Sequence, residues 1–189
     1  MNFYSDEIIN DMLDNAPLEE LIDTLENLKE KIRNSLHRFT ANEIQSNYID
    51  GLLGDERNKV VFYCMDFEFD IENCPVMMIY RKSIDRSRDK SRSKVEIRYY
   101  ILMLCTKLNF RKKGYASILL DGFLDKIQKE KPPEECTRKI ILSSVETAVL
   151  FYEAYGFRWT TETLSDHPIL MLTEKKEEDK EYFIMEMTI

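Results

Sequence analysis

Residues 104–120, LCTKLNFRKKGYASILL, place a strand pattern, a basic loop and a helix pattern directly next to one another. The residues before the loop, Val95 to Cys105, end in the almost wholly apolar run YYILMLC, which is typical of a central strand covered on both faces. From Ala116 onward, apolar residues recur at the spacing of one helix face: Leu119, Leu120, Phe123, Leu124 and Ile127. The sequence therefore predicts a buried strand, a short basic turn, and a helix that begins at the turn.

A helix that begins at such a turn is suited to hold an anion. The first backbone N–H groups of a helix have no partner inside it, and they lie at the positive end of the helix dipole. Gly114 lacks a Cβ, so a phosphate can approach the backbone closely, and Ala116 keeps the next contact small. Arg111, Lys112 and Lys113 supply positive charge. We predict a diphosphate-binding turn here, and the alternative is an ordinary basic connection between a strand and a helix.

The composition is that of an acidic globular protein. The chain has 189 residues, enough for one domain with a sizeable core, and is 43% hydrophobic and 33% charged. Its net charge of -8 argues against general binding to nucleic acid or anionic membranes, since both need a basic surface. The longest clean apolar run, Tyr99 to Cys105, is far shorter than the ~20 residues that span a bilayer, and the acidic N-terminus lacks the basic region of a signal peptide.

The four cysteines, Cys64, Cys74, Cys105 and Cys136, show no metal-binding spacing, so no metal site is expected. Scattered single thiols are typical of a reducing compartment. We therefore expect a cytoplasmic or nuclear protein.

Residues 1–56 predict a helical N-terminal segment that packs on a core formed by residues 57–189. Pro17 suits a helix start, and apolar residues recur at helical spacing to about Phe39: Leu18, Leu21, Ile22, Leu25, Leu28, Ile32 and Leu36. A further helix is predicted from Asn42 to Leu53, ending at Gly54. The long helix could instead bind a partner or gate the substrate.

The middle of the chain predicts strands. Lys59 to Phe67 and Pro75 to Arg81 are rich in β-forming residues, with Glu68 to Cys74 as the connection between them. Arg81 to Lys94 has seven basic and two acidic residues, a local charge of 7 − 2 = +5, and no apolar period. We interpret it as a solvated loop, with phosphate or RNA binding as the alternative.

The last third alternates strand and helix patterns. Lys139 to Ser143 predicts a buried strand, and a helix face follows, with Gly156 as its C-terminal cap: Ala148, Phe151, Tyr152 and Tyr155. Further strands are predicted at residues 157–163, 168–172 and 182–189, with a solvent-facing turn over residues 174–181.

Two of these segments together resemble the GNAT family of acetyl-CoA-dependent N-acetyltransferases. The first carries the Arg/Gln-x-x-Gly-x-Gly/Ala loop of that family as Arg111, Gly114 and Ala116. The second carries Ala-x-x-x-Tyr and a closing Gly-Phe in AVLFYEAYGF, residues 148–157. The resemblance implies an α/β (α+β) fold with a mixed, mostly antiparallel central sheet, flanking helices and a V-shaped splay between two strands.

The resemblance also implies how the cofactor, acetyl-CoA, would bind. Its pantetheine arm would lie along the end of the splayed strand, at Leu104, Cys105 and Thr106. Its pyrophosphate would sit on the amides of residues 111–116, which include Tyr115. The acceptor amine would attack the thioester directly in a ternary complex, so no covalent carrier is needed and Cys105 is assigned to packing.

Tyr152 matches the family's general acid, which protonates the departing thiolate; the alternative is a core tyrosine. Glu96 is a weak candidate for the general base, and could equally be an exposed strand residue. Where some members carry a catalytic glutamate in this strand, the sequence has Tyr100. His37 and His167 are possible bases that nothing in the sequence links to the site.

Another departure is Val145, where many members have asparagine; Ser144 or Thr147 could supply that contact. The acidic charge suits a cationic amine acceptor: a protein N-terminus, a lysine, a polyamine or an aminoglycoside. We expect acetyl-CoA and an amine as partners, not membrane or nucleic acid, and a monomer or homodimer. The alternative function is a catalytically degenerate acyl-CoA-binding or protein-interaction module.

Overall fold

The structure is a computed structural model that describes residues 3–4, 18–39, 44, 46–63, 74–86, 95–131, 136–173 and 181–189. The chain divides into two compact units: residues 1–79 with 103–127, and residues 80–102 with 128–189. Two long strands, β3 (Val76–Arg86) and β4 (Val95–Thr106), contribute residues to both units.

The first unit combines a small group of strands with the longer helices. Its remaining elements are β1 (Phe3–Tyr4), α2 (Leu18–Phe39), α3 (Ser46–Gly54), β2 (Asn58–Tyr63), the 3-10 turn η2 (Leu108–Phe110) and most of α4 (Tyr115–Lys129). β1 pairs antiparallel with β2, and β3 is the next strand. The Lys107 N–H donates to the Pro75 carbonyl at 2.9 Å and joins the residue after β4 to the start of β3.

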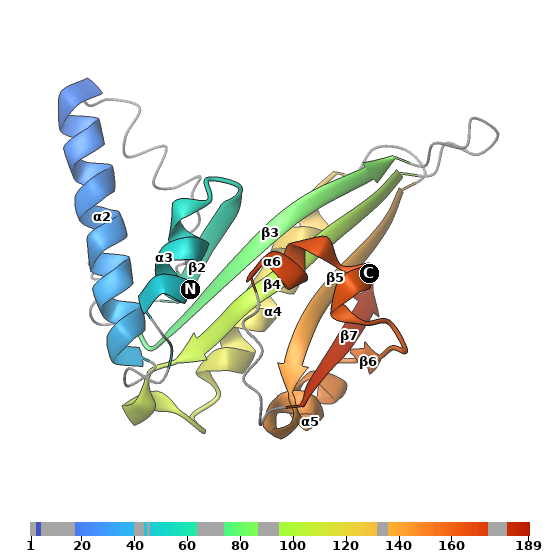
Figure 1. The fold of residues 1–189 in the computed structure, drawn as a ribbon. Helices are drawn as coiled ribbons and strands as arrows, with labels where there is room; N and C mark the ends of the chain where they lie inside the picture. The colour runs from blue at the N-terminus through green and yellow to red at the C-terminus, as the bar shows by residue number, and fades with distance from the viewer. Residues whose placement is uncertain are drawn as a thin grey trace. The chain divides into compact units, whose positions relative to one another are not determined.

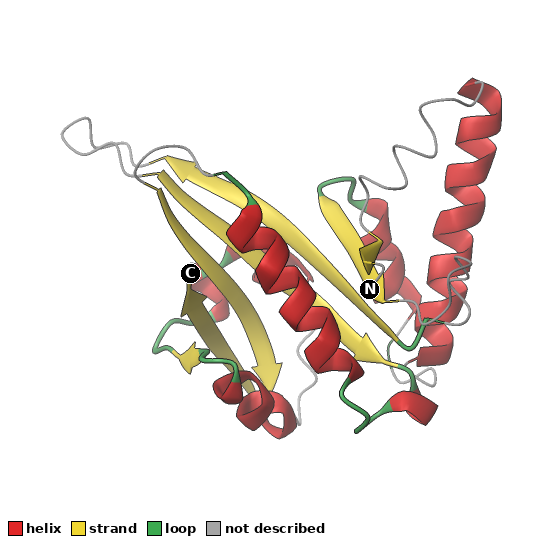
Figure 2. Ribbon diagram, turned by 180° about the vertical axis from the view of Figure 1, so that it is seen from behind, coloured by secondary structure: helices red, strands yellow, loops and turns green. Residues whose placement is uncertain are grey.

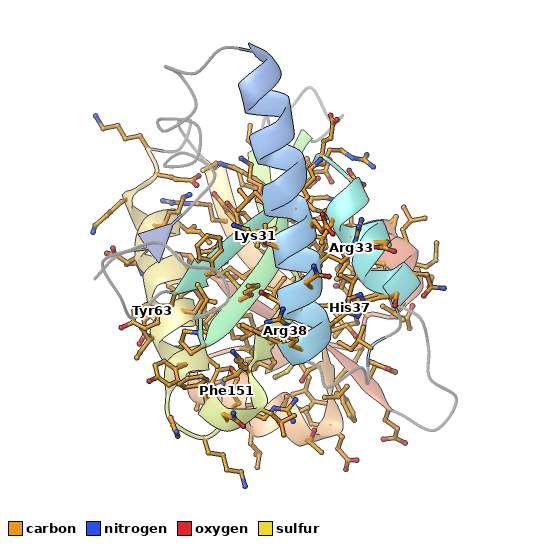
Figure 3. The ribbon with its side chains drawn as sticks, turned by 90° about the vertical axis from the view of Figure 1, so that its left-hand side faces the viewer. Lys31, Arg33, His37, Arg38, Tyr63 and Phe151 are labelled. Atoms are coloured by element: carbon orange, nitrogen blue, oxygen red, sulfur yellow. The ribbon has the colours of Figure 1, made fainter. Side chains whose placement is uncertain are left out.

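The N-terminal helices bury an apolar face and expose a charged one. In α2, Ile32, Leu36 and Phe39 are buried at helical spacing. Arg33 forms an ion pair with Asp50 of α3 at 2.5 Å, and Figure 3 shows it among the charged side chains along α2. This burial supports the interpretation of α2 as a helix packed on the protein's own core.

The second unit is a sheet with short helices (Figure 1). Besides parts of β3 and β4 it contains β5 (Cys136–Val145), the 3-10 turn η3 (Glu146–Ala148), α5 (Val149–Ala154), β6 (Arg158–Trp159), the 3-10 turn η4 (Leu164–Asp166), α6 (Pro168–Thr173) and β7 (Tyr182–Thr188). The strand order is β3-β4-β5-β7-β6. β4 and β5 are parallel, whereas β7 is antiparallel to both β5 and β6.

The pairing of β4 with β5 stops before either strand ends. It runs from Val95 opposite Cys136 to Ile101 opposite Leu142, although β4 continues to Thr106 and β5 to Val145. On its other side, β5 stays paired with β7 up to Val145. Figure 2 shows these strands from behind. The predicted mixed, mostly antiparallel sheet with a strand splay is therefore confirmed.

Several predicted elements are confirmed with changed boundaries. α2 matches its prediction, α4 buries four of its five predicted apolar residues, and β5 is longer than predicted. α3 begins at Ser46 rather than Asn42, and β3 continues to Arg86 into the predicted loop. Residues 64–73, 87–94 and 174–180 lie outside the described residues, and the predicted boundary between residues 56 and 57 stays a prediction.

One strand prediction in the C-terminal part is wrong, and another is confirmed over a shorter range. Residues 168–172 lie in the helix α6, because Pro168 fits a first helical turn and the Met171 N–H donates to the His167 carbonyl at 2.9 Å. The strand predicted for residues 157–163 is only Arg158–Trp159, since η4 follows shortly after.

The cysteines also differ from expectation. Cys74 is disulfide-bonded, whereas Cys105 and Cys136 are free thiols. The expectation of single thiols throughout is therefore wrong for Cys74.

Among the described residues, no helix is both long enough and apolar enough to cross a membrane.

Candidate functional site

The basic turn before α4 has a backbone that requires glycine. Gly114 has φ +83° and Lys112 has φ +61°, both in the left-handed region that L-residues disfavour. The Ile118 N–H donates to the Gly114 carbonyl at 3.0 Å, so Gly114 is the residue that immediately precedes α4 and accepts its first hydrogen bond. A Cβ added at Gly114 would meet nothing within 4 Å. The glycine therefore serves the turn's conformation and leaves open space beside the backbone.

The amides of this turn are available to a ligand. Within the described part of the chain, no backbone or side-chain group accepts a hydrogen bond from the N–H of Lys112, Lys113, Gly114 or Ala116. Residues 111–114 are exposed. Four donors at the positive end of a fifteen-residue helix suit a multiply charged anion.

Side chains on both sides hold the turn in shape. The Arg111 Nε donates to the Thr106 carbonyl at 3.3 Å, which ties the turn to the end of β4. The Lys113 Nζ lies 5.4 Å from the centre of the Phe110 ring, and that ring packs edge-on against Tyr115, with centroids 5.5 Å apart. Tyr63 of β2 then contacts Tyr115 at 6.1 Å. Arg111 is thus partly committed to the protein, while Lys112 and Lys113 remain exposed.

The end of β4 carries the predicted pantetheine contacts. Leu104, Cys105 and Thr106 are half-buried and lie beyond Ile101, where the pairing with β5 ends. They belong to the first unit, as the basic turn does. Their assignment to the cofactor stays a prediction.

Tyr152 is buried on α5 in the second unit. Its ring packs edge-on against Phe151 and Phe157 at 5.1 and 5.5 Å. The chain turns sharply after the helix, with Gly156 at φ +95°, and the Phe157 N–H donates to the Tyr152 carbonyl at 3.2 Å. Burial raises the pKa of the Tyr152 hydroxyl, so this group stays protonated at neutral pH. Among the described residues no group bonds to this hydroxyl, and it is chemically able to donate a proton.

One face of β4 carries a row of polar side chains, because alternate strand residues point the same way. Glu96 accepts a hydrogen bond from the Arg98 Nε at 2.5 Å, and Arg98 also hydrogen-bonds Tyr100. Partial burial disfavours the charged form of Arg98, but these hydrogen bonds outweigh it and raise the pKa of the guanidinium. Glu96, the weak candidate base, is therefore held in an ion pair, and its catalytic role stays a prediction.

His167 joins this row from a distant part of the sequence. Its ring packs edge-on against Tyr100, with centroids 6.0 Å apart. Its Nε2 is 2.8 Å from a carboxylate oxygen of Glu162. Sequence reasoning named His167 but could not link it to Tyr100, because no local pattern connects residues so far apart. His37 lies on α2 in the first unit.

Only one of the two residues predicted to replace the family asparagine near Val145 is accessible to a ligand. The Ser144 hydroxyl is buried and donates to the Val145 carbonyl at 3.0 Å, so it already has a partner. Thr147 is exposed in η3. Of these two substitutes for the family asparagine, Thr147 is the more accessible.

Comparison with known proteins identifies a domain family and a fold. Residues 86–178 match the model described as an acetyltransferase (GNAT) domain. No curated protein matches the sequence. A chain of the NatC complex bound to Gag peptide and CoA is 17% identical, with a TM-score of 0.54 over 85% of this chain and 92% of that one. Arabidopsis thaliana NAA60 with a bisubstrate analogue is 13% identical, with a TM-score of 0.56 over 85% and 94%.

The ribosomal-protein-S18-alanine N-acetyltransferase from Escherichia coli is 12% identical, with a TM-score of 0.54 over 83% of this chain and 87% of that one. At such identities the likeness of these three structures to this chain shows the fold alone.

Proposed function

Because residues 86–178 match the acetyltransferase (GNAT) domain model, we propose that the chain is an N-acetyltransferase that passes the acetyl group of acetyl-CoA to a primary amine. The observation that carries this proposal is the turn before α4, where four amides without acceptors among the described residues lie beside exposed basic side chains. A diphosphate is the part of coenzyme A that such a group of donors would bind.

The residues fit the two ends of this ligand in different ways. The amides of Lys112, Lys113, Gly114 and Ala116 would hold the diphosphate, with the side chains of Arg111, Lys112 and Lys113 balancing its charge. The backbone of Leu104 to Thr106 would hold the pantetheine arm, because this part of β4 lies beyond Ile101, where the pairing with β5 ends. When bound, the thioester supplies an activated acyl group and a thiolate that can leave.

Tyr152 would act as the general acid. A thiolate leaves more easily when a proton reaches it, and the Tyr152 hydroxyl carries a proton at neutral pH. Glu96 remains a candidate base for the acceptor amine, although Arg98 competes for its carboxylate. Cys105 has no chemical role in this scheme, since direct attack needs no covalent carrier.

The acceptor is proposed to be the amine of a protein or peptide. Among the similar structures, the NatC complex is bound to a Gag peptide, and the E. coli enzyme is a ribosomal-protein-S18-alanine N-acetyltransferase. The net charge of -8 favours a cationic acceptor by long-range attraction. A polyamine is the small-molecule acceptor that the same charge would favour.

Two measurements test the proposal. Isothermal titration with acetyl-CoA measures cofactor binding, and thiol release measured with Ellman's reagent reports turnover. The amine panel contains a peptide with a free N-terminal methionine, an N-acetylated peptide with one free lysine, and spermidine. Binding with turnover of one amine supports the enzyme. Binding without turnover of any amine supports the degenerate acyl-CoA-binding module, and absence of binding contradicts both functions.

A further inference from the structure

His167 has one ring nitrogen with a partner and one without. The residue is 3% exposed, and Nε2 lies 2.8 Å from the Glu162 carboxylate. Nδ1 is buried, and among the described residues it has no hydrogen-bond partner. Buried nitrogens without partners are rare in native proteins, and a catalytic role or a bound molecule is a usual explanation.

The partner of Nε2 determines which nitrogen carries the proton. A carboxylate only accepts hydrogen bonds, so Nε2–H is the donor to Glu162. In the neutral ring, Nδ1 then carries the lone pair. His167 is thus held with the proton on Nε2, and the basic nitrogen Nδ1 has no hydrogen-bond partner among the described residues.

The surroundings connect this nitrogen with the end of the β4–β5 pairing. Tyr100, which contacts the His167 ring, precedes Ile101, the last paired residue of β4. Three charged or titratable groups of the described residues lie near His167: Glu162 and Asp166 of its own segment, and Tyr100 of β4.

We propose that His167 is the general base of the reaction and takes the proton of the attacking amine on Nδ1, while Glu162 holds the ring. This inference rests on the proposed N-acetyltransferase function. It assigns the base to α6 and its preceding segment rather than to β4.

The proton balance of the step is simple. The amine nitrogen of the neutral acceptor forms the C–N bond with the thioester carbonyl carbon, and the C–S bond breaks. The nitrogen loses one proton to Nδ1 of His167, and the sulfur gains one proton from the Tyr152 hydroxyl. Both residues return to their starting states by exchange with solvent, so the products are an amide and coenzyme A thiol.

Glu96 fits this role less well. Its carboxylate is already bound by Arg98 at 2.5 Å. It also lies four residues before Tyr100, about 13 Å along the strand at a rise of about 3.3 Å per residue. His167 is in direct contact with Tyr100, and its base nitrogen has no partner among the described residues.

The test is His167→Gln, because the glutamine amide can still donate to Glu162 but has no basic nitrogen at the Nδ1 position. We expect kcat/KM to fall by about 100-fold or more, within the usual contribution of general base catalysis. The acidic limb of the wild-type pH profile should also be lost. The matched control is His37→Gln on α2, which should keep both rate and profile. A His167→Gln enzyme within twofold of wild type, or one that is slower at every pH with the limb intact, overturns the proposal.

A second measurement on the wild-type protein decides the matter even where the variant does not fold. The kcat/KM profile is recorded with two acceptor amines of different basicity. With kcat/KM calculated per concentration of neutral amine, which removes the protonation of the acceptor itself, an acidic limb at the same pH for both amines belongs to the enzyme and supports a protein base. A profile without such a limb overturns the proposal. Wild-type protein that binds no acetyl-CoA contradicts the proposed function instead, so the two failures are distinguishable.

Discussion

Replacing Gly114 by glutamate tests the basic turn most directly when it is compared with alanine at the same position. Both substitutions put a Cβ on a backbone with φ +83°. In neither variant does the Cβ meet an atom within 4 Å. Both variants therefore carry the same cost of backbone strain, about 1–2 kcal/mol of stability. For a protein of this size, about 1 kcal/mol corresponds to a fall in Tm of about 2–4 °C. The alanine and glutamate variants should therefore melt at similar temperatures, slightly below wild type.

The charge on glutamate supplies the difference in binding. Two like charges about 4 Å apart repel by about 1 kcal/mol in water and about 4 kcal/mol at the effective permittivity typical of a protein surface. The turn is exposed, so about 1–2 kcal/mol for each of the two phosphates is expected. The total of about 2–4 kcal/mol corresponds to about 30- to 700-fold weaker binding of coenzyme A to Gly114→Glu than to Gly114→Ala.

The assay is calorimetric titration of both variants with coenzyme A at low salt and at 1 M salt. At 1 M salt the Debye length is about 3 Å, so the difference between the variants should shrink. Equal affinities at low salt, within about twofold (~0.4 kcal/mol), would refute the diphosphate assignment. A difference that salt does not reduce would refute the electrostatic reasoning.

Three further predictions concern single side chains. Tyr152→Phe should lower turnover about 100-fold or more, measured as thiol release. Coenzyme A affinity by titration and Tm by thermal melting should stay unchanged, because the Tyr152 hydroxyl has no partner among the described residues. Unchanged turnover would exclude Tyr152 as the general acid. Glu130→Ala should cost about 1–3 kcal/mol in urea denaturation, because it removes the carboxylate that accepts the hydrogen bond of the buried Tyr99 hydroxyl at 2.7 Å. A cost as large in a Tyr99→Phe background contradicts this reason. Hydrogen bonds from the Thr163 amide and hydroxyl lower the pKa of Asp166, so the stability it contributes is present above the ordinary aspartate pKa of about 3.9 and is lost as pH falls through the folded-state value. Asp166→Asn should therefore lower Tm at pH 7, with a gap to wild type that closes below about pH 4, and a constant gap would contradict the assignment.

Local patterns account for the elements that position the proposed cofactor site. The apolar run before Cys105, the glycine at 114 and the helix spacing after Ala116 each depend on neighbours within a few residues. The structure places β4, the turn and α4 accordingly, and both family motifs lie on the predicted elements.

The errors lie where short segments carry ambiguous patterns. Residues 168–172, PILML, are apolar at almost every position, so periodicity cannot separate a strand from a helix. Pro168 favours a helix start, and the α6 turn forms around it. The length of β6 could not be predicted from local pattern either, because it depends on how many residues pair with β7.

The sequence by itself determined a strand, a glycine-marked turn and two helices in family order, because these follow from steric and periodic rules over short distances. Only the tertiary structure decided that His167 packs against Tyr100, that Arg98 hydrogen-bonds the Glu96 carboxylate, and that the pairing of β4 with β5 ends at Ile101. Such contacts join residues far apart in the chain or on neighbouring strands. They arise when the sheet and the segment before α6 pack together, a step that no local pattern encodes.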